Sequence, residues 1–391
     1  MTASSAAPPA LTWSGVTARR MGRHGLAQPS ADLGLADVAG VLCGIHAQVL
    51  SAAELSAGRR VAGATRADVR RALWEERTLV KTFGPRGTVH LLPAADLPMW
   101  TGALSAVPSP APPEPIRFTS GQAEEVLVAI GDALADTELT VDELTEALAD
   151  RAGPWAVEPT MDGFGDRWPR WRQLTSTAAH RGLLCFGPDR GRKVTYTSPR
   201  RWLPGFAAAD GDPALRALLA RYLHAYGPAT PRHFARWLGI PPRRTAEAFG
   251  ALGDDGELER VDLSGEPAWV LAGDTHTPPE PHRGVRLLPY FDAYVVAGQP
   301  RELLYPGPAA TRALVPSGQA GNYPVLLIDG LVGGVWHQRR SGRKLAITVE
   351  PLRELTAAQR RQLDDEASLV GAVMEATVTL TMGTVSVGPH A

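Results

Sequence analysis

Apolar side chains recur at helical spacing along the first part of the chain and then alternate with polar ones. Helices are predicted at residues 13–24, 36–43, 51–58 and 65–76. In the last of these, Thr65 with Asp68 three residues on is a capping pattern. Alternating strands at 79–83 and 88–92 then flank Gly84-Pro85-Arg86-Gly87, a hairpin signal. Helices followed by a β-hairpin predict a winged helix over residues 11–107, with the hairpin as its wing.

The same order of helices and hairpin returns twice, without obvious sequence identity. The second series has helices at 122–135, from 140 and at 167–180, with strands at 183–186 and 194–197. The third has helices at 215–226, from Thr230 and at 243–252, with strands at 256–262 and 268–271. A proline-rich joint at 108–115 separates the first series from the second, and another at 277–281 ends the third. Two further winged helices are therefore predicted, over residues 116–204 and 210–275.

The last third of the chain has short alternating runs at 285–288, 325–329, 331–336 and 344–349. A helix at 356–371 and a final strand at 376–381 follow. This pattern predicts a small β-barrel or curled sheet over residues 282–391. The fold class is therefore α+β, with three tandem winged helices and a C-terminal β-domain.

Composition narrows the class of protein. A chain of 391 residues is too long for one ordinary domain, and 44% hydrophobic with 21% charged residues is typical of a folded soluble protein. No apolar run approaches the ~18–20 residues that span a bilayer. Residues 1–10 lack the pattern of a secretory signal, so a cytoplasmic location is expected. Cys43 and Cys185 are interpreted as buried free thiols rather than a disulfide or a zinc site.

The distribution of charge is more informative than the net charge of −1. Residues 167–202 hold nine arginines and lysines and one acid, Asp189. A second cluster, at residues 339–344, lies between two predicted strands. The candidates for DNA contact in these clusters are Arg170, Arg192, Lys193, Arg339, Arg340, Arg343 and Lys344. Tryptophans near the first cluster favour phosphate contact over a merely solvated face, which is the alternative interpretation.

Several common catalytic motifs are absent from the sequence. There is no glycine-rich phosphate loop, no His-Glu-x-x-His, no Cys-x-x-Cys and no Gly-x-Ser-x-Gly. Nucleotide hydrolysis, zinc chemistry and the commonest serine hydrolase are therefore not the first hypotheses, and neither a metal nor a cofactor is expected.

Five runs of sequence carry a resemblance to a known family. They are Trp13-Ser14-Gly15-Val16-Thr17-Ala18-Arg19-Arg20, Gly44-Ile45-His46-Ala47-Gln48, Leu79-Val80-Lys81-Thr82-Phe83, Arg86-Gly87-Thr88-Val89-His90-Leu91-Leu92-Pro93 and Leu287-Leu288-Pro289-Tyr290-Phe291-Asp292-Ala293-Tyr294. In this order and spacing they resemble the AlkZ/YcaQ-type winged-helix DNA glycosylases, from about residue 11 to residue 381.

The resemblance implies a fold and an activity. It implies three winged helices and a β-barrel in a C-shape around duplex DNA. The implied reaction is hydrolysis of the N-glycosidic bond of a bulky alkylated base. In some members of the family this unhooks interstrand crosslinks, as self-resistance to a genotoxic natural product. The expected partner is double-stranded DNA with alkylated bases, and the expected state is a monomer.

The resemblance places catalysis at His46 and Gln48. AlkZ-like members carry Gln-x-Gln at these positions and YcaQ-like members carry Gln-x-Asp, so His46 departs from both. An imidazole with a pKa near its usual value of about 6.5 can accept a proton from water, while an amide orients that water. The departure marks either a branch with histidine in this role or a member with altered activity. The structural alternatives are a histidine bonded to backbone and an exposed polar glutamine.

Other residues of the quoted runs have less specific roles. Lys81 and Arg86 on the first hairpin are candidates for phosphate contact, and His90 either faces the lesion or bonds within the hairpin. Lys81 is the only lysine near the proposed site, and nothing in its sequence surroundings is expected to lower its pKa, so a Schiff-base lyase step is disfavoured. Phe291 and Asp292, with Tyr294, are interpreted as a packing and hydrogen-bonding unit of the β-domain, with a role in the site as the alternative.

Two functional hypotheses follow. The first is a monofunctional DNA glycosylase that acts on bulky N7-alkylguanine or N3-alkyladenine. The second is a non-catalytic winged-helix DNA-binding protein, either a lesion sensor or a transcription regulator. A regulator would prefer a defined sequence and ignore alkylation, whereas a glycosylase would release the damaged base.

Overall fold

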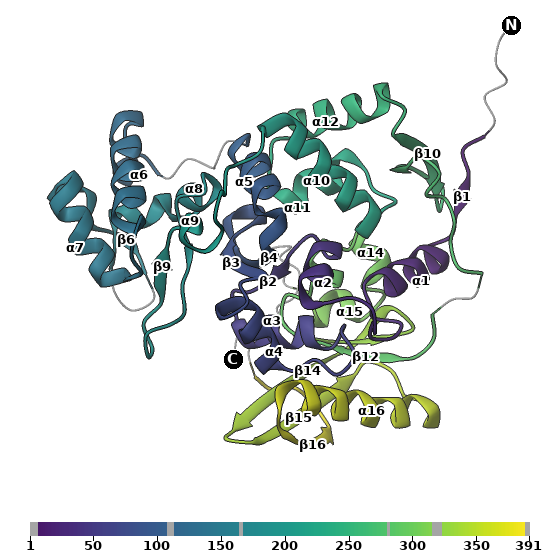
Figure 1. Cartoon of the computed structure of the whole chain (residues 1–391). Helices are drawn as coiled ribbons and strands as arrows, with labels where there is room; N and C mark the ends of the chain where they lie inside the picture. Colours follow the sequence, from purple (N-terminus) through teal and green to yellow (C-terminus); the bar gives the residue numbers. More distant parts are fainter. Residues whose placement is uncertain (1–6, 108–112, 164–166, 280–281, 315–322, 388–391) are drawn as a thin grey trace, which may run out of the picture. The chain divides into compact units, whose positions relative to one another are not determined.

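The computed structural model describes residues 7–107, 113–163, 167–279, 282–314 and 323–387 (Figure 1). The fold is a mixture of α-helices and β-strands, as predicted. Two compact units are present: Met1–Arg71 with Leu219–Ala391, and Ala72–Leu218. The first unit is therefore formed by an N-terminal and a C-terminal segment of the chain. Part of the predicted joints at 108–115 and 277–281 lies outside the described residues.

The N-terminal part of the first unit contains the predicted short helices. They are α1 (Trp13–Arg23), α2 (Leu35–Val41) and α3 (Leu50–Gly58), with β2 (Ile45–His46) before α3; α4 (Arg66–Trp74) runs on into the second unit. The predicted cap of α4 is present, because the Asp68 carboxylate accepts hydrogen bonds from the Thr65 backbone N–H and hydroxyl, both at 2.8 Å. At the start of α1 the cap residue itself is the acceptor, since the Thr12 hydroxyl accepts from the Gly15 N–H at 3.2 Å.

The predicted third series of elements is also present. Its helices are α10 (Gly211–Tyr226, which begins in the second unit), α11 (Pro231–Leu238) and α12 (Pro242–Asp254), followed by the antiparallel strands β10 (Leu258–Leu263) and β11 (Glu266–Leu271). A short strand near the N-terminus, β1 (Ala10–Leu11), pairs in parallel with β10. This strand was not predicted, because two residues form no detectable pattern. Leu11 and Val16 pack with Val261 and Val270, so the hairpin is joined to the start of the chain.

The C-terminal part forms a curled five-stranded sheet, one of the two predicted forms. The strands are β12 (Val285–Leu288), β13 (Val325–Ile328), β14 (Leu331–Ser341), β15 (Lys344–Pro351) and β16 (Thr377–Met382), in that order. Neighbours are antiparallel except β15 and β16, which are parallel and joined by α16 (Ala357–Met374). Helix α16 lies along the sheet (Figure 1), and its apolar residues belong to the core of that sheet. Three short helices between β12 and β13 were not predicted: α13 (Ala293–Ala297), α14 (Arg301–Leu304) and α15 (Ala309–Arg312).

Arginines of α1 bind backbone carbonyls far along the chain. Arg19 donates to the carbonyl oxygens of Asp274 at 2.8 Å and Gly227 at 2.9 Å, and Arg20 donates to the carbonyl oxygen of Gln299 at 2.8 Å. Burial lowers the pKa of Arg20 to about 10. Buried guanidinium groups need such partners, so α1 connects the third hairpin region to the C-terminal sheet region within the first unit.

The second unit holds the first and second hairpins. Its strands are β3 (Leu79–Phe83), β4 (Val89–Pro93), β5 (Leu139–Thr140), β6 (Pro159–Asp162), β7 (Arg167–Pro169), β8 (Cys185–Phe186) and β9 (Thr195–Thr197). Its α-helices are α5 (Leu97–Ser105), α6 (Ser120–Leu134), α7 (Val141–Ala152), α8 (Thr175–His180) and α9 (Pro199–Trp202). Short 3₁₀ turns lie at Pro85–Gly87, Ala94–Asp96, Glu114–Ile116, Pro154–Ala156 and Arg170–Leu174. Both predicted hairpins form, since β3 pairs with β4 and β8 with β9.

The prediction of one helix over residues 167–180 was wrong. Residues Arg167–Pro169 form β7, which pairs with β6, and a 3₁₀ turn precedes the shorter helix α8. Pro169 explains the difference, because proline restricts the preceding residue, Trp168, to extended backbone. The arginines and tryptophans at the start of this segment therefore do not lie on an α-helix.

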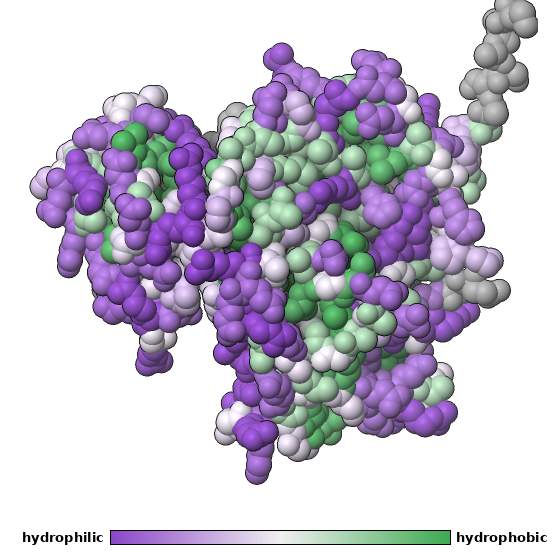
Figure 2. Space-filling model, viewed as in Figure 1, coloured by the Kyte–Doolittle hydropathy of each residue, from purple (hydrophilic) through white to green (hydrophobic). Residues whose placement is uncertain are grey.

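Two further expectations concern the cysteines and the absence of a helix that spans a membrane. Cys43 and Cys185 are buried free thiols, as predicted, and burial raises the pKa of Cys185. Within the described ranges, every helix is too short or too polar to cross a bilayer. The face shown in Figure 2 is largely hydrophilic, with apolar side chains gathered in smaller areas.

Candidate functional site

The backbone that leads to His46 is tightly constrained. After α2, Cys43 (φ 51°) and Gly44 (φ 93°) both have left-handed backbone, and the Gly44 N–H donates to the Ala39 carbonyl oxygen at 2.8 Å. Such a reversal is a common end of a helix, and glycine adopts it without strain. The Tyr226 hydroxyl of α10 donates to the Leu42 carbonyl oxygen at 2.7 Å. The chain therefore enters β2 along a fixed path.

His46 and Gln48 lie in different surroundings although they are close in sequence. His46 ends β2 and is 9% exposed, whereas Gln48, in the connection to α3, is exposed. Ala47 between them is buried. The predicted turn is thus a short strand end and a bend, with an enclosed imidazole followed by an amide that solvent reaches. This arrangement suits a proton acceptor paired with a group that orients water.

The ring of Phe291 lies against the His46 imidazole. The ring centroids are 4.6 Å apart with an interplanar angle of 31°. Phe291 itself has a left-handed backbone, with φ 55°. The run Leu287–Tyr294 is therefore part of the surroundings of His46, which fits the alternative interpretation of Phe291 as a residue near the site.

A buried ion pair holds the residue next to Phe291. Arg60 binds both carboxylate oxygens of Asp292, at 2.7 and 2.9 Å, and the Ser56 hydroxyl donates to the same carboxylate at 2.8 Å. Both charged side chains are 0% exposed. Burial alone would raise the pKa of Asp292, but the Arg60 charge and these hydrogen bonds outweigh burial and lower it. Asp292 is therefore an ionised structural group, in line with its predicted role.

Helix α3, which follows the candidate residues His46 and Gln48, is anchored on the C-terminal sheet. Leu55 of α3 belongs to the core of that sheet, and the Arg59 guanidinium binds the Glu366 carboxylate of α16 at 2.7 Å. A Cβ atom added to Gly58 would lie 2.5 Å from a Val373 methyl carbon, so only glycine allows this approach of α3 and α16. His46 is thus carried by a scaffold built from both ends of the chain.

The first hairpin, in the second unit, places its three candidates differently. Arg86 is exposed at the turn, with left-handed backbone (φ 59°). His90 is buried, and its Nδ1 donates to the Thr88 carbonyl oxygen at 2.8 Å. Lys81 is 9% exposed, with its Nζ 4.6 Å from the Phe186 ring centroid. Burial lowers the pKa of Lys81, although Asp189 opposes the shift. The expectation that nothing depresses this pKa was wrong, because the folded chain buries the lysine and its sequence neighbours do not reveal that burial.

The basic cluster of residues 167–202 is largely engaged within the second unit. Arg170 donates to the carbonyl oxygens of Ile116 at 3.0 Å and Arg117 at 2.7 Å. Lys193 pairs with Asp142 of α7 at 2.8 Å, which raises the lysine pKa, and Arg192 is exposed. The acids of α7 lie outside the basic stretch, so counting charge along the sequence did not reveal them.

The basic cluster of residues 339–344 is displayed at one hairpin of the first unit. Strands β14 and β15 end at the pair Ser341 and Lys344, and Gly342 in the turn has φ 57°. The four candidates Arg339, Arg340, Arg343 and Lys344 are all exposed. Arg340 also donates to the Met374 carbonyl oxygen at 2.9 Å, which braces the hairpin against α16. This hairpin brings all four predicted cations to one place.

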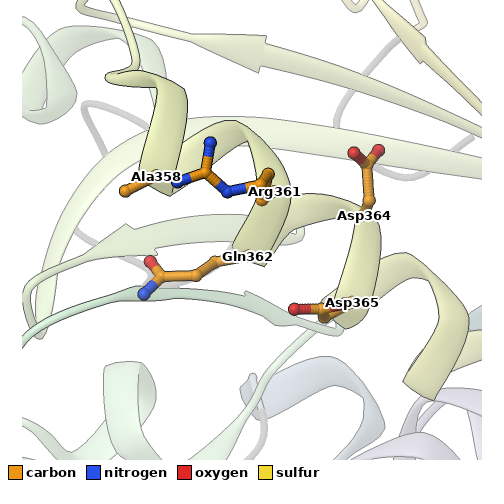
Figure 3. A pocket seen from close by; sticks show the side chains of 5 residues that line it. All are labelled: Ala358, Arg361, Gln362, Asp364 and Asp365. Atoms are coloured by element: carbon orange, nitrogen blue, oxygen red, sulfur yellow. The ribbon is translucent and has the colours of Figure 1, made fainter.

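Two hollows in the first unit involve other residues. One, of about 460 Å³, lies on α16 and is lined by Ala358, Arg361, Gln362, Asp364 and Asp365 (Figure 3). The other, of about 340 Å³, is lined by Pro306, Pro308, Ala309, Ile328, Asp329, Leu331, Val332, Gly333, Leu352 and Arg353. Neither is lined by His46 or Gln48. Among the residues that the structure describes, no cluster of three or more histidines, cysteines or acids could hold a metal ion.

Comparison with known proteins agrees with the resemblance. A family model described as DNA glycosylase AlkZ-like matches residues 39–373. An interstrand DNA cross-link repair glycosylase from Streptomyces sahachiroi is 34% identical over 339 residues, covering 83% of this chain and 87% of the relative. The solved structure of the Streptomyces sahachiroi DNA glycosylase AlkZ superposes with a TM-score of 0.81 and 30% identity, over 96% of this chain and 100% of that one.

Proposed function

Because the chain belongs to the AlkZ-like DNA glycosylase family and is therefore a DNA glycosylase, we propose that it releases bulky N7-alkylguanine or N3-alkyladenine from duplex DNA. The observation that carries the proposal is the enclosed His46 imidazole two residues before an exposed Gln48, on an anchored scaffold. The relative named for interstrand cross-link repair supports unhooking of crosslinks as part of the same activity. The hypothesis of a non-catalytic regulator has no comparable support.

The reaction needs little help at the leaving group. An N7- or N3-alkylated purine is already cationic, so the bond to C1′ breaks with its electron pair moving into the base, which leaves neutral. The oxygen of water then bonds to C1′. In our proposal the His46 imidazole accepts the proton that this water loses, and the Gln48 amide orients the water. No cofactor is required for this balance of atoms and charge.

The DNA-binding architecture belongs to the same proposal. Each succession of helices and hairpin, over residues 11–107, 116–204 and 210–275, is proposed to act as a winged helix, with residues 282–391 as the β-domain of a C-shaped clamp. The α10–α12 series followed by β10 and β11 supports this interpretation for the third segment. DNA as the substrate supports action in the cytoplasm. The exposed cations Arg86 and Arg192 are proposed phosphate contacts, together with those of the β14–β15 hairpin.

Base release from a defined duplex tests the proposed function. A labelled duplex with one bulky N7-alkylguanine should acquire an abasic site when incubated with the wild-type chain, scored as strand breakage after hot alkali. Enzyme-free duplex measures spontaneous loss, and an unmodified duplex serves as the second control. Release equal to the enzyme-free rate from both N7- and N3-alkylated duplexes would contradict the proposal.

The β14–β15 hairpin gives a prediction about DNA affinity. Arg343→Ala and Lys344→Ala should each weaken binding to duplexes of any sequence, since exposed cations act on phosphates and release counterions. The slope of log affinity against log salt should become less steep by roughly 0.9 for each phosphate that the variant no longer neutralises. Fluorescence anisotropy at several salt concentrations measures both quantities.

A matched variant distinguishes direct phosphate binding from net charge. Arg361→Ala removes one exposed cation from α16 in the same unit. This variant should bind with the wild-type slope. Equal slopes for Arg361→Ala and the two hairpin variants would assign the effect to overall charge and remove the hairpin from the DNA interface.

A further inference from the structure

We propose that Phe291 is a positioning residue for the reaction: its ring fixes the plane of the His46 imidazole, and the buried Arg60–Asp292 pair fixes Phe291. This inference rests on the proposed role of His46 as proton acceptor. Its basis is the close, tilted contact of the two rings, whose centroids are 4.6 Å apart with an interplanar angle of 31°. A general base must present one nitrogen to water within a narrow range of directions. A ring packed against the imidazole restricts that direction.

The backbone of Phe291 indicates that its position is imposed. A bulky side chain at φ 55° is an outlier, because left-handed backbone brings Cβ close to the following carbonyl oxygen. Strained backbone of this kind persists only where the surroundings overdetermine it, and such positions cluster at functional sites.

The restraint on Phe291 comes from its neighbour. Asp292 accepts two hydrogen bonds from Arg60 and one from Ser56, and its carboxylate also accepts the Tyr294 N–H at 3.0 Å to cap α13. The backbone on the carboxyl side of Phe291 is therefore held at several points. On its other side, the Tyr290 ring lies at a tilt of 39° to the Phe291 ring, with the centroids 6.0 Å apart.

The side chains that bind Asp292 lie on, or just beyond, the helix that follows His46. Ser56 lies in α3 and Arg60 just beyond its end, and α3 begins at Leu50, soon after His46. The helix that follows the proposed proton acceptor thus holds the carboxylate that follows Phe291. A displacement of α3 would therefore move His46 and Asp292 together. This arrangement keeps the positions of His46 and Phe291 relative to each other constant, although the two residues are distant in sequence.

Kinetics of Phe291 variants test the role. Phe291→Leu and Phe291→Ala should lower kcat by about 10- to 100-fold, the scale expected for a misplaced catalytic group. KM and duplex affinity should stay near wild type, because the ring acts on the imidazole of His46 rather than on the DNA. Phe291→Tyr keeps the aromatic ring and should restore most of kcat. Circular dichroism checks the fold, and Phe291→Leu serves if Phe291→Ala does not fold.

Combination with His46→Ala separates positioning from general structural damage. If Phe291 acts only through His46, Phe291→Leu should cause no further loss in the His46→Ala background. Equal losses in both backgrounds, a parallel loss of duplex affinity, or a wild-type kcat in Phe291→Leu would each overturn the inference. Absence of base release by the wild-type chain would instead count against the proposed function. Wild-type release that His46→Ala leaves unchanged would overturn the roles of both His46 and Phe291.

Discussion

His46→Ala should slow release of an N7-alkylguanine by about 10²- to 10⁴-fold, the usual contribution of a positioned general base. Alanine leaves the attacking water without a proton acceptor, while the cationic base still leaves readily. Single-turnover measurement with enzyme in excess isolates this chemical step from product release. Affinity for the alkylated duplex should remain close to wild type, because the enclosed imidazole offers little surface for contact.

Two companion variants sharpen this test. Gln48→Ala should cause a smaller loss than His46→Ala, because an orienting amide is removed and the proton acceptor stays. His46→Gln restores the Gln-x-Gln pattern that the family resemblance implies for AlkZ-like members, so it should retain more activity than His46→Ala. A His46→Ala chain as fast as wild type would refute the catalytic assignment while leaving DNA glycosylase membership intact.

Asp292→Asn should destabilise the first unit by about 3–5 kcal/mol, the usual cost of leaving one member of a buried ion pair without its partner. The Arg60 guanidinium would then be fully buried beside a neutral amide. Denaturant unfolding followed by tryptophan fluorescence gives the change in free energy. Because folding lowers the Asp292 pKa, the pair stabilises the protein above the carboxyl's unfolded value of about 3.9. That contribution is lost as the pH falls through the lower folded value.

Controls for this prediction come from both units. Arg60→Met combined with Asp292→Asn should be less destabilised than Asp292→Asn alone, because no uncompensated charge stays buried. Lys193→Ala breaks an exposed ion pair with Asp142 and should leave unfolding unchanged. A small effect of Asp292→Asn, similar to that of Lys193→Ala, would show that the buried pair is not needed to hold the segment that carries Phe291.

Local patterns in the sequence determined most of the secondary structure, and the resemblance to a family supplied the candidate catalytic pair. The alternation at 79–83 and 88–92 became β3 and β4, and the Thr65–Asp68 pattern became a helix cap. These features form between residues close in sequence, so neighbouring side chains are sufficient to specify them. The helix predicted at 167–180 failed for an equally local reason, the proline at position 169.

Only the tertiary structure determined which distant residues meet. Phe291 lies on His46, Arg60 binds Asp292, and Phe186 covers Lys81. No periodicity encodes such pairs, because hydrophobic patterns record that a side chain is buried but not what it is buried against. Charge along the chain has the same limit, since the acid that pairs with Lys193 lies on α7. The sequence therefore determined the candidate chemical groups, whereas long-range packing determined their surroundings and orientation.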